Sequence, residues 1–355
     1  MFKAYKFLSS MLFVVAPASA CFVFITSCGK TDYSDYQSEH VKFINERTFF
    51  IITKDSATSA YMGGTAWIFK KSADGDYTYY LGTNVHVAAS FSSSTTEEMP
   101  MEIGYNPTYS QRKWLNLTKD YLPINNYELL GEEATTRPTK SDWNLGSEFF
   151  EWDVDFDVFK VTFGSNPDDI KNNDPFVHDN DSPLLDRLNN LNNYATQHDG
   201  TITQFAKSNY QYKSGMSIHV AGFPFREDPN YMNEDFPLWT SYSTTYDFNN
   251  VNYNTTNNPI MSTDEGIRFK DEKPINIIGK VMGYKPNSSP ELTGGSSGSM
   301  VVDDNNIVVA INFFGETDGR GNATQNCGLF LNTNDDYFGK NYKYEIFNDW
   351  FQNLL

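Results

Sequence analysis

The chain has 355 residues, a formal net charge of −18, and an aromatic content of 16% that includes 28 Phe and 22 Tyr. This length is enough for one large or two small domains with a sizeable core. So acidic a protein lacks the basic surface that phosphate-rich partners require, which argues against nucleic-acid binding and against charge-driven binding to an anionic membrane.

The N-terminal residues 1–27 have the pattern of a secretory signal. Lys3 and Lys6 make the start positive, and an apolar run continues to Ile25. Removing these two lysines takes the formal charge of the rest of the chain from −18 to −20. The alternative is an uncleaved membrane anchor, for which the run is barely long enough. Either interpretation places the rest of the chain outside the cytoplasm.

The segment Ile25–Lys30 resembles a bacterial lipoprotein box, in which the cysteine thiol is alkylated by diacylglycerol and becomes the mature N-terminus. We expect lipidation at Cys28, because the second candidate, Cys21, would leave an apolar run on the mature chain. The polar residues 28–45 are expected to form a flexible spacer. The lipid on Cys28 would then anchor the protein on the extracellular face of the cell membrane. Cys327 is then without an intramolecular partner, so we expect no disulfide.

Short β-favouring runs recur between clusters of Asn, Asp, Gly and Ser, and they predict a mostly β fold with many loops. A strand at Gly63–Phe69 and another beginning at Tyr79 are separated by the turn sequence Ala73–Asp76, which predicts a hairpin. His86 lies where the second strand should end. Its imidazole is either a general base, because it can take and return a proton near neutral pH, or a structural side chain.

The segment Trp152–Val161 alternates as a strand does and places Asp153, Asp155 and Asp157 on one face. One interpretation is an ordinary strand with a solvated acidic face. The other is that one carboxylate turns inward and holds a histidine N–H.

The segment Gly295–Ser299 precedes the apolar run Met300–Val302. Its glycines allow a tight turn that exposes a serine hydroxyl, although so short a pattern also arises by chance. In the chain order His, Asp, Ser, the three segments form the base, orienter and nucleophile set of a serine hydrolase. The other histidines lack such a context, and His219 in its apolar run is expected in the core.

These motifs resemble trypsin-like serine proteases of the bacterial glutamyl-endopeptidase and HtrA type. More narrowly, they resemble the peptidase domain of the mycoplasma immunoglobulin protease family of surface lipoproteins. Thr83–Val87 is similar to the superfamily's Thr-Asn-x-His-Val, and Gly295–Ser299 is similar to its Gly-x-Ser-Gly-Ser/Gly. Asp155–Val161 resembles the strand that carries the triad aspartate, in a register that selects Asp155 and leaves Asp157 as second choice.

The resemblance implies an all-β, trypsin-like fold of two six-stranded antiparallel β-barrels with the active site between them. The apolar residues near the C-terminus recur at helical spacing and predict a terminal helix on the second barrel. The segments 89–150 and 164–213 do not map onto the family and are either substrate-recognition loops or tolerated insertions. The expected organisation is a first barrel at 46–165, an insertion at 166–212, a second barrel at 213–340 and a helix at 341–355.

The same resemblance implies roles for individual residues. His86, Asp155 and Ser297 would form the triad, and the backbone N–H groups of Gly295 and Ser297 would form the oxyanion hole. Ser296 stands where trypsin-type zymogens have the aspartate that pairs with a new N-terminus, so we expect direct folding to a competent state. No metal or cofactor is implied.

The expected substrate contacts come from two segments. The strand that contains Asn312, Phe313 and Phe314 would pair with an extended substrate. Glu291 lies six residues before Ser297, where trypsin-like enzymes have the base of the primary pocket. This spacing gives the hypothesis of a preference for Lys or Arg at the cleaved position, and the alternative is an ordinary loop carboxylate.

The resulting expectation is a surface-tethered serine endopeptidase that acts on extracellular proteins. The resemblance implies host immunoglobulin heavy chains as substrate and a separate immunoglobulin-binding partner protein. Two alternatives stay open. One is a catalytically silent binding protein or adhesin on the same fold. The other is an HtrA-like quality-control protease, which usually carries a peptide-binding domain that this sequence does not show.

Overall fold

The computed structural model describes the greater part of the chain from residue 38 onward. The signal region, Cys21, Cys28, Asp153 and Glu291 lie outside the described residues. No helix within the described stretches is both long and apolar enough to cross a membrane. These stretches are 38–54, 61–91, 99–108, 115–116, 119–130, 155–207, 209–211, 215–227, 235–237, 239–247, 260–262, 266–268, 281–284, 292, 294–317, 323–331 and 350–355.

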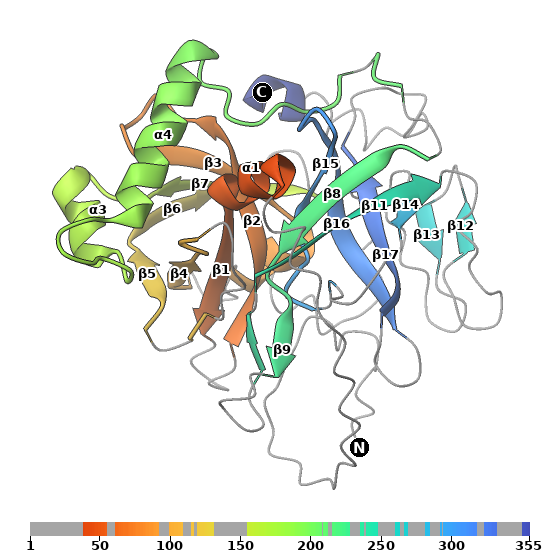
Figure 1. Ribbon diagram of the computed structural model, residues 1–355, viewed down its shortest axis with the longest axis horizontal. Coiled ribbons are helices and arrows are strands. Elements are labelled where there is room, and N and C mark those ends of the chain that lie inside the picture. Colours follow the sequence, from red (N-terminus) through yellow and green to blue (C-terminus); the bar gives the residue numbers. More distant parts are fainter. Residues whose placement is uncertain are drawn as a thin grey trace, which may run out of the picture.

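The first unit is a seven-stranded antiparallel sheet with the order β5-β4-β1-β2-β3-β7-β6 (Figure 1). The predicted hairpin is present, since β2 and β3 pair with Trp67 opposite Gly82 and Lys71 opposite Tyr79. The strands are β1 (Thr48–Lys54), β2 (Tyr61–Lys71), β3 (Thr78–Thr83), β4 (Met101–Gly104), β5 (Tyr121–Ile124), β6 (Asn126–Leu129) and β7 (Asp157–Thr162).

The second unit is a closed six-stranded barrel with the order β11-β14-β17-β16-β15-β8. The all-β, antiparallel fold class is therefore confirmed, although the first unit has seven strands where six were expected. The barrel strands are β8 (Ser217–Gly222), β11 (Thr240–Asp247), β14 (Val281–Tyr284), β15 (Met300–Asp303), β16 (Val308–Thr317) and β17 (Ala323–Phe330). Two small hairpins accompany them, β9 (Phe225–Glu227) with β10 (Asp235–Pro237) and β12 (Ile260–Ser262) with β13 (Gly266–Arg268).

The flexible spacer was expected to extend to residue 45, and this boundary is wrong, because helix α1 (Glu39–Arg47) already begins at Glu39. The Ser38 hydroxyl accepts the backbone N–H of Val41 at 3.1 Å and so forms the N-cap of this helix. Val41 and Ile44 are three residues apart, so they lie on one face of the helix, and both are fully buried. Because α1 contacts β1 and β2 of the first unit and β8 of the second, it is part of the folded core.

The Asn- and Asp-rich insertion forms two helices against the first unit, α3 (Pro167–Asn173) and α4 (Pro183–Gln197), as Figure 1 shows. The Ser182 hydroxyl caps α4 by accepting the N–H of Leu185. Apolar residues of α4 at helical spacing, Leu184, Leu188 and Leu191, are buried in the core of the first unit. The insertion therefore completes this core. Two further short helices are α2 (Val85–Ala88) and the 3-10 turn Ala89–Phe91.

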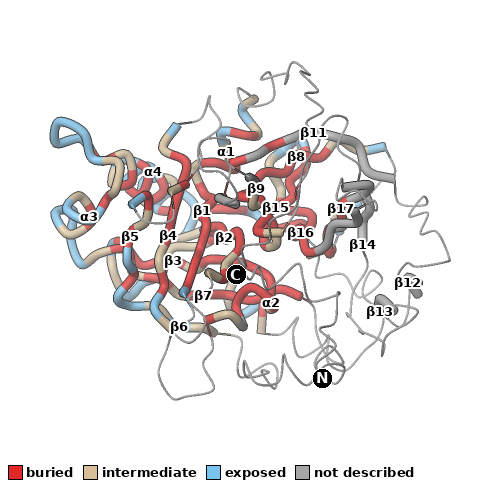
Figure 2. Tube along the Cα trace, turned by 90° about the horizontal axis from the view of Figure 1, so that it is seen from below, coloured by how far each residue is buried: buried red, intermediate tan, exposed pale blue. Residues whose placement is uncertain are grey.

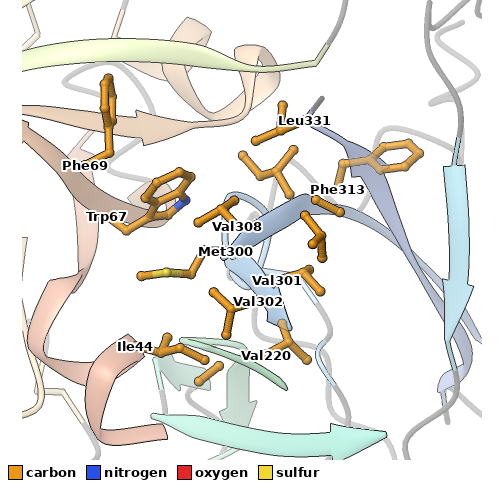
Figure 3. Packing of buried hydrophobic residues seen from close by; sticks show 14 of the residues in the cluster. Ile44, Trp67, Phe69, Val220, Met300, Val301, Val302, Val308, Phe313 and Leu331 are labelled. Carbon is orange, nitrogen blue, oxygen red and sulfur yellow. The ribbon is translucent and has the colours of Figure 1, made fainter. Parts of the chain in front are cut away.

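The largest apolar cluster joins the two units. Buried residues run through the central strands of both sheets, whereas exposed residues lie at the periphery (Figure 2). Figure 3 shows Trp67 of β2 directed toward Met300 and Val308 of the barrel, and all three are fully buried. This shared core fixes the relative position of the strands that end at the site described below.

The C-terminal helix occupies a different place from the one expected. Helical residues 350–354 are described, whereas 341–349 lie outside the described part of the chain. The Phe351 ring is 5.2 Å from that of Phe156 and 4.8 Å from that of Phe205. Lys70 of β2 also donates to the Leu354 carbonyl at 2.7 Å. These contacts are with the first unit and with Phe205, which forms a bridge to Val308 of the barrel, rather than with the second barrel alone.

Candidate active site

His86 and Asp155 lie side by side although 69 residues separate them. The antiparallel pairing of β3 with β7 places Thr83 opposite Asp157, so the residues just after β3 meet those just before β7. His86 follows β3 in the short helix α2, and Asp155 precedes β7. Both are buried, at 8% and 5% exposure. The strand register thus creates the pair.

The carboxylate of Asp155 accepts two hydrogen bonds from His86. The Nδ1 atom is 2.6 Å from Oδ2, and the backbone N–H of His86 donates to Oδ1 at 3.2 Å. Because the carboxylate is an acceptor, this contact places the ring proton on Nδ1 and leaves Nε2 as the nitrogen that can take a proton. The inward-turned carboxylate of the second interpretation is therefore present.

Neighbouring polar groups separate the candidates for the orienting acid. Asn84 donates its side-chain N–H to the Asp155 carbonyl oxygen at 2.6 Å, a supporting contact that the sequence reasoning did not assign although Asn84 belongs to the quoted motif. Asp157 instead accepts the backbone N–H of Val158 at 2.7 Å. The carboxylate beside His86 is that of Asp155.

The glycine-serine turn is built around two residues in the left-handed region. Gly295 and Gly298 both have φ of +90°. A Cβ at Gly298 would lie 1.9 Å from the Thr65 carbonyl oxygen, so only glycine fits there. Among the three serines, Ser296 and Ser299 are buried at 1% and 0% exposure, and Ser297 is half-buried. The turn therefore presents the hydroxyl that the sequence singled out.

Ser297 and Val87, the residue after His86, both lie close to Gly64 and Thr65 of β2. The backbone N–H of Thr65 donates to the Ser297 carbonyl oxygen at 2.8 Å. A Cβ at Gly64 would lie 3.0 Å from that oxygen and 2.6 Å from Cγ2 of Val87. The absence of a side chain at Gly64 lets the turn of the second unit approach the helix that carries His86.

The peptide groups expected to form the oxyanion hole have a defined orientation. The Gly294 carbonyl accepts the N–H of Phe225 at 2.7 Å, and the Ser296 carbonyl accepts the N–H of Ser299 at 3.0 Å. A trans peptide points its N–H opposite to its C=O, so the N–H groups of Gly295 and Ser297 point away from these partners. Neither N–H donates to an acceptor within the described residues. Both N–H groups therefore point away from the hydrogen bonds that hold the turn.

The expected substrate strand is used in part by the protein itself. The Asn312 carbonyl accepts the N–H of Gly298, and the Asn312 N–H donates to the Ser299 carbonyl, both at 2.8 Å. The backbone of Asn312 is therefore already paired. Pairing of β16 with β15 reaches Ile311, so the described part of β16 from Phe313 onward has β17 as neighbour on one side. Phe313 is 7% exposed, and of Phe314 only the backbone is described.

A second histidine cluster lies outside this site. His40, His219 and Asp304 each bring one ligand-type atom within 4.8 Å of the others. The two rings are stacked, however, with centroids 3.9 Å apart and planes at 16°, so their in-plane lone pairs do not converge on one point. Asp304 lies 2.8 Å from His219 Nε2, and Asn306 lies 2.9 Å from His40 Nδ1. The cluster fastens α1 and β8 to the β15–β16 turn, as a core role for His219 predicts.

Burial lowers the pKa of His219 below its ordinary value, and the stacked ring of His40 lowers the pKa further. The hydrogen bond that His219 makes to the Asp304 carboxylate opposes this lowering of the pKa. Its surroundings therefore favour the neutral form of the His219 imidazole.

Comparison with protein families gives a match over most of the chain. The model of the family described as Mycoplasma immunoglobulin protease matches residues 38–128 and 120–314, which include His86, Asp155 and Ser297. No curated protein sequence matches.

Similar solved structures are proteases of low sequence identity. A thermostable serine protease from an extremophilic microorganism is 14% identical, with 86% of this chain and 99% of that chain covered and a TM-score of 0.39. A protease of M. tuberculosis in its active form is 13% identical, with 89% and 88% covered and a TM-score of 0.40. An inactivated protease paralogue of the scabies mite is 12% identical, with 92% and 97% covered and a TM-score of 0.39.

Proposed function

Because the chain belongs to the Mycoplasma immunoglobulin protease family, we propose that it is a serine endopeptidase in which Ser297 is the nucleophile, His86 the general base and Asp155 the orienting carboxylate. The observation that carries this assignment is the buried contact of 2.6 Å between His86 Nδ1 and Asp155 Oδ2. It fixes the tautomer in which Nε2 can accept the serine proton.

The proposed reaction uses these three side chains. The Ser297 hydroxyl attacks the carbonyl carbon of the scissile peptide while His86 takes its proton, and Asp155 stabilises the imidazolium that forms. The imidazolium then protonates the leaving amine, and the acyl group stays on Ser297. A water molecule, deprotonated by His86, attacks the acyl-enzyme and releases the second product.

The N–H groups of Gly295 and Ser297 would bind the oxygen that becomes negative in the tetrahedral intermediate. Donors already held in this orientation stabilise the developing charge without reorganisation. Each such donor is typically worth roughly 3–4 kcal/mol of transition-state stabilisation. We further propose that the part of β16 beyond its described pairing with β15 binds the extended substrate, as strand addition does in other peptide-binding proteins.

The substrate and location belong to the same proposal. The family description, Mycoplasma immunoglobulin protease, supports an immunoglobulin substrate. Cleavage in the heavy chain of host immunoglobulin and a separate immunoglobulin-binding partner protein are proposed from the resemblance of the motifs alone. The lipoprotein-like Ile25–Lys30 segment supports a lipid anchor at Cys28 on the extracellular face of the membrane. Such an anchor would keep the enzyme at the cell surface, where host antibodies bind.

The test uses the full-length protein in detergent, incubated with immunoglobulin G with and without candidate immunoglobulin-binding partners. Wild type is expected to fragment the heavy chain and to be labelled by a fluorophosphonate at Ser297, and Ser297→Ala is expected to do neither. Equal cleavage by both forms would refute the nucleophile assignment. Absence of both hydrolysis and labelling in wild type would favour the silent binding protein.

A further inference from the structure

In the turn Gly295–Ser299, which we call the nucleophile turn, the carbonyl oxygen of Ser296 accepts three hydrogen bonds. It accepts the backbone N–H of Ser299 at 3.0 Å, the hydroxyl of Ser299 at 2.7 Å and the side-chain N–H of Asn312 at 3.2 Å. The same Asn312 nitrogen lies 3.3 Å from the hydroxyl oxygen of Ser296. One buried side-chain amide, that of Asn312, thus contacts both the carbonyl oxygen and the hydroxyl oxygen of Ser296, the residue before the nucleophile.

These contacts fix the plane of one particular peptide group. The Ser296 carbonyl and the Ser297 N–H belong to the same trans peptide and point in opposite directions. Donors that hold the carbonyl toward the barrel therefore hold the N–H toward the side where a substrate carbonyl would lie. A peptide rotation that released the carbonyl would turn the N–H away and remove one oxyanion donor.

Asn312 is well placed to control this rotation. Its backbone is paired on both sides to the turn, through Gly298 N–H and the Ser299 carbonyl, so its Cα cannot drift. Its side chain is 2% exposed, and hydrogen bonds in such a desolvated place are stronger than in water. An amide with two N–H groups can donate to both oxygens of Ser296 at once, which a hydroxyl or a carboxylate cannot do.

We infer that Asn312 is a positioning residue for the oxyanion hole, holding the Ser296–Ser297 peptide in the orientation that catalysis needs. The inference rests on the proposed function and gives Asn312 a role different from the substrate contact expected from the sequence. It also supplies an internal partner for Ser296, so the turn is held without a pairing to a newly cut N-terminus.

The test compares Asn312→Ala and the isosteric Asn312→Asp with Asn45→Ala. Asn45 is a matched control, because it is also buried and donates its side-chain N–H to a backbone carbonyl, that of Asn106, at 3.3 Å. Since loss of one oxyanion donor typically lowers kcat by about 10²–10³, we expect the Asn312 variants to lose about 10- to 100-fold in kcat, with KM nearly unchanged. Affinity for a peptidyl trifluoromethyl ketone, which mimics the tetrahedral intermediate, should fall in proportion.

A purely structural role predicts another result. If the Asn312 variants lose thermal stability as Asn45→Ala does but keep kcat and inhibitor affinity, the inference is overturned. Ser296→Ala, which removes one of the two acceptors and leaves the packing, gives a milder variant should the others fail to fold. Crystal structures of wild type and Asn312→Ala decide the question without activity, because the inference requires a rotated 296–297 peptide in the variant. Wild type without hydrolysis would count against the proposed function only.

Discussion

Thr65 of the first unit binds the nucleophile turn of the second unit with both its backbone and its side chain. Its N–H donates to the Ser297 carbonyl at 2.8 Å, and its hydroxyl donates to the Gly295 carbonyl at 3.0 Å. The same hydroxyl accepts the N–H of Phe223 at 3.1 Å. Thr65 therefore connects three parts of the molecule: the turn that contains Ser297, the end of β8 in the barrel, and the sheet of the first unit, which also positions His86.

Substitution of Thr65 by Val removes the hydroxyl while keeping the shape of the side chain. We expect a loss of about 1–3 kcal/mol in unfolding free energy, because a buried carbonyl and a buried N–H lose their partner. We also expect a lower kcat, because the hydroxyl no longer holds the Gly295–Ser296 peptide group, which lies between the two candidate oxyanion donors. Urea unfolding and peptide hydrolysis measure the two effects.

The matched control for this substitution is Thr53→Val. Thr53 lies in β1 of the same sheet at 2% exposure, and its hydroxyl has no hydrogen-bond partner among the described residues. Valine there should be neutral or stabilising, since no bond is lost. Equal losses in the two variants would show that the Thr65 contacts contribute nothing specific.

Asp155→Asn tests the orienting carboxylate. An amide can turn its N–H toward Nδ1 and favour the wrong histidine tautomer, so we expect kcat to fall about 10⁴-fold, as for the same change in other triads. Asp157→Asn is the matched control two residues away, because its carboxylate accepts the N–H of Val158 and not the imidazole. Steady-state kinetics on a peptide ester give the comparison, and comparable losses in both variants would contradict the assignment.

Gly298→Ala should be far more destabilising than Gly215→Ala. Both glycines have similar positive φ, +90° and +84°. A Cβ at Gly215 would meet nothing within 4 Å, whereas at Gly298 it would lie 1.9 Å from the Thr65 carbonyl oxygen. We expect about 1–2 kcal/mol for the φ strain alone at Gly215. At Gly298 we expect more than about 4 kcal/mol, which marks exceptional single substitutions. Similar losses in denaturant unfolding would show that the turn is not packed against β2.

The sequence pointed to the candidate catalytic side chains, but it did not reveal the residues that hold them in position. The order of the His, Asp and Ser motifs pointed to three side chains that lie next to strand ends: His86 follows β3, Asp155 precedes β7 and Ser297 precedes β15. The choice of Asp155 over Asp157 depended on family register, and the physical reason is the β3–β7 pairing, which no local pattern contains. The role of Asn312 depends on which face of β16 meets the turn, and a single strand does not reveal its neighbour.

One wrong boundary and one helix that the sequence did not assign have local causes. The spacer boundary was set by polar composition, although Ser38 as N-cap and Val41 and Ile44 at helical spacing indicate a helix. Polar composition also hides the helix α4 within the expected insertion, although Ser182–Pro183 and the leucines that follow fit a helix start. In both helices a few apolar residues on one face determine the packing, and the average composition hides them.

Acidification should weaken the cluster that fastens α1 to the barrel. His219 has a folded-state pKa below its ordinary value of 6.5, so the unfolded chain binds more protons in that window. Its contribution to stability is therefore present above pH 6.5 and is lost as the pH falls through the folded-state pKa. Protonation of His219 places a positive charge in a buried position beside the His40 ring, and Asp303 and Asp304 offset this only in part.

The measurement is the unfolding free energy of wild type minus that of His219→Gln, followed from about pH 7.5 to about pH 5. Glutamine keeps a donor for Asp304 and does not titrate, so we expect this difference to shrink as the pH falls. His178→Gln is the matched control, because His178 also contacts a carboxylate, that of Asp179 at 2.8 Å, but is 86% exposed. A difference that stays constant for His219→Gln would show that this ring is not a source of the acid sensitivity.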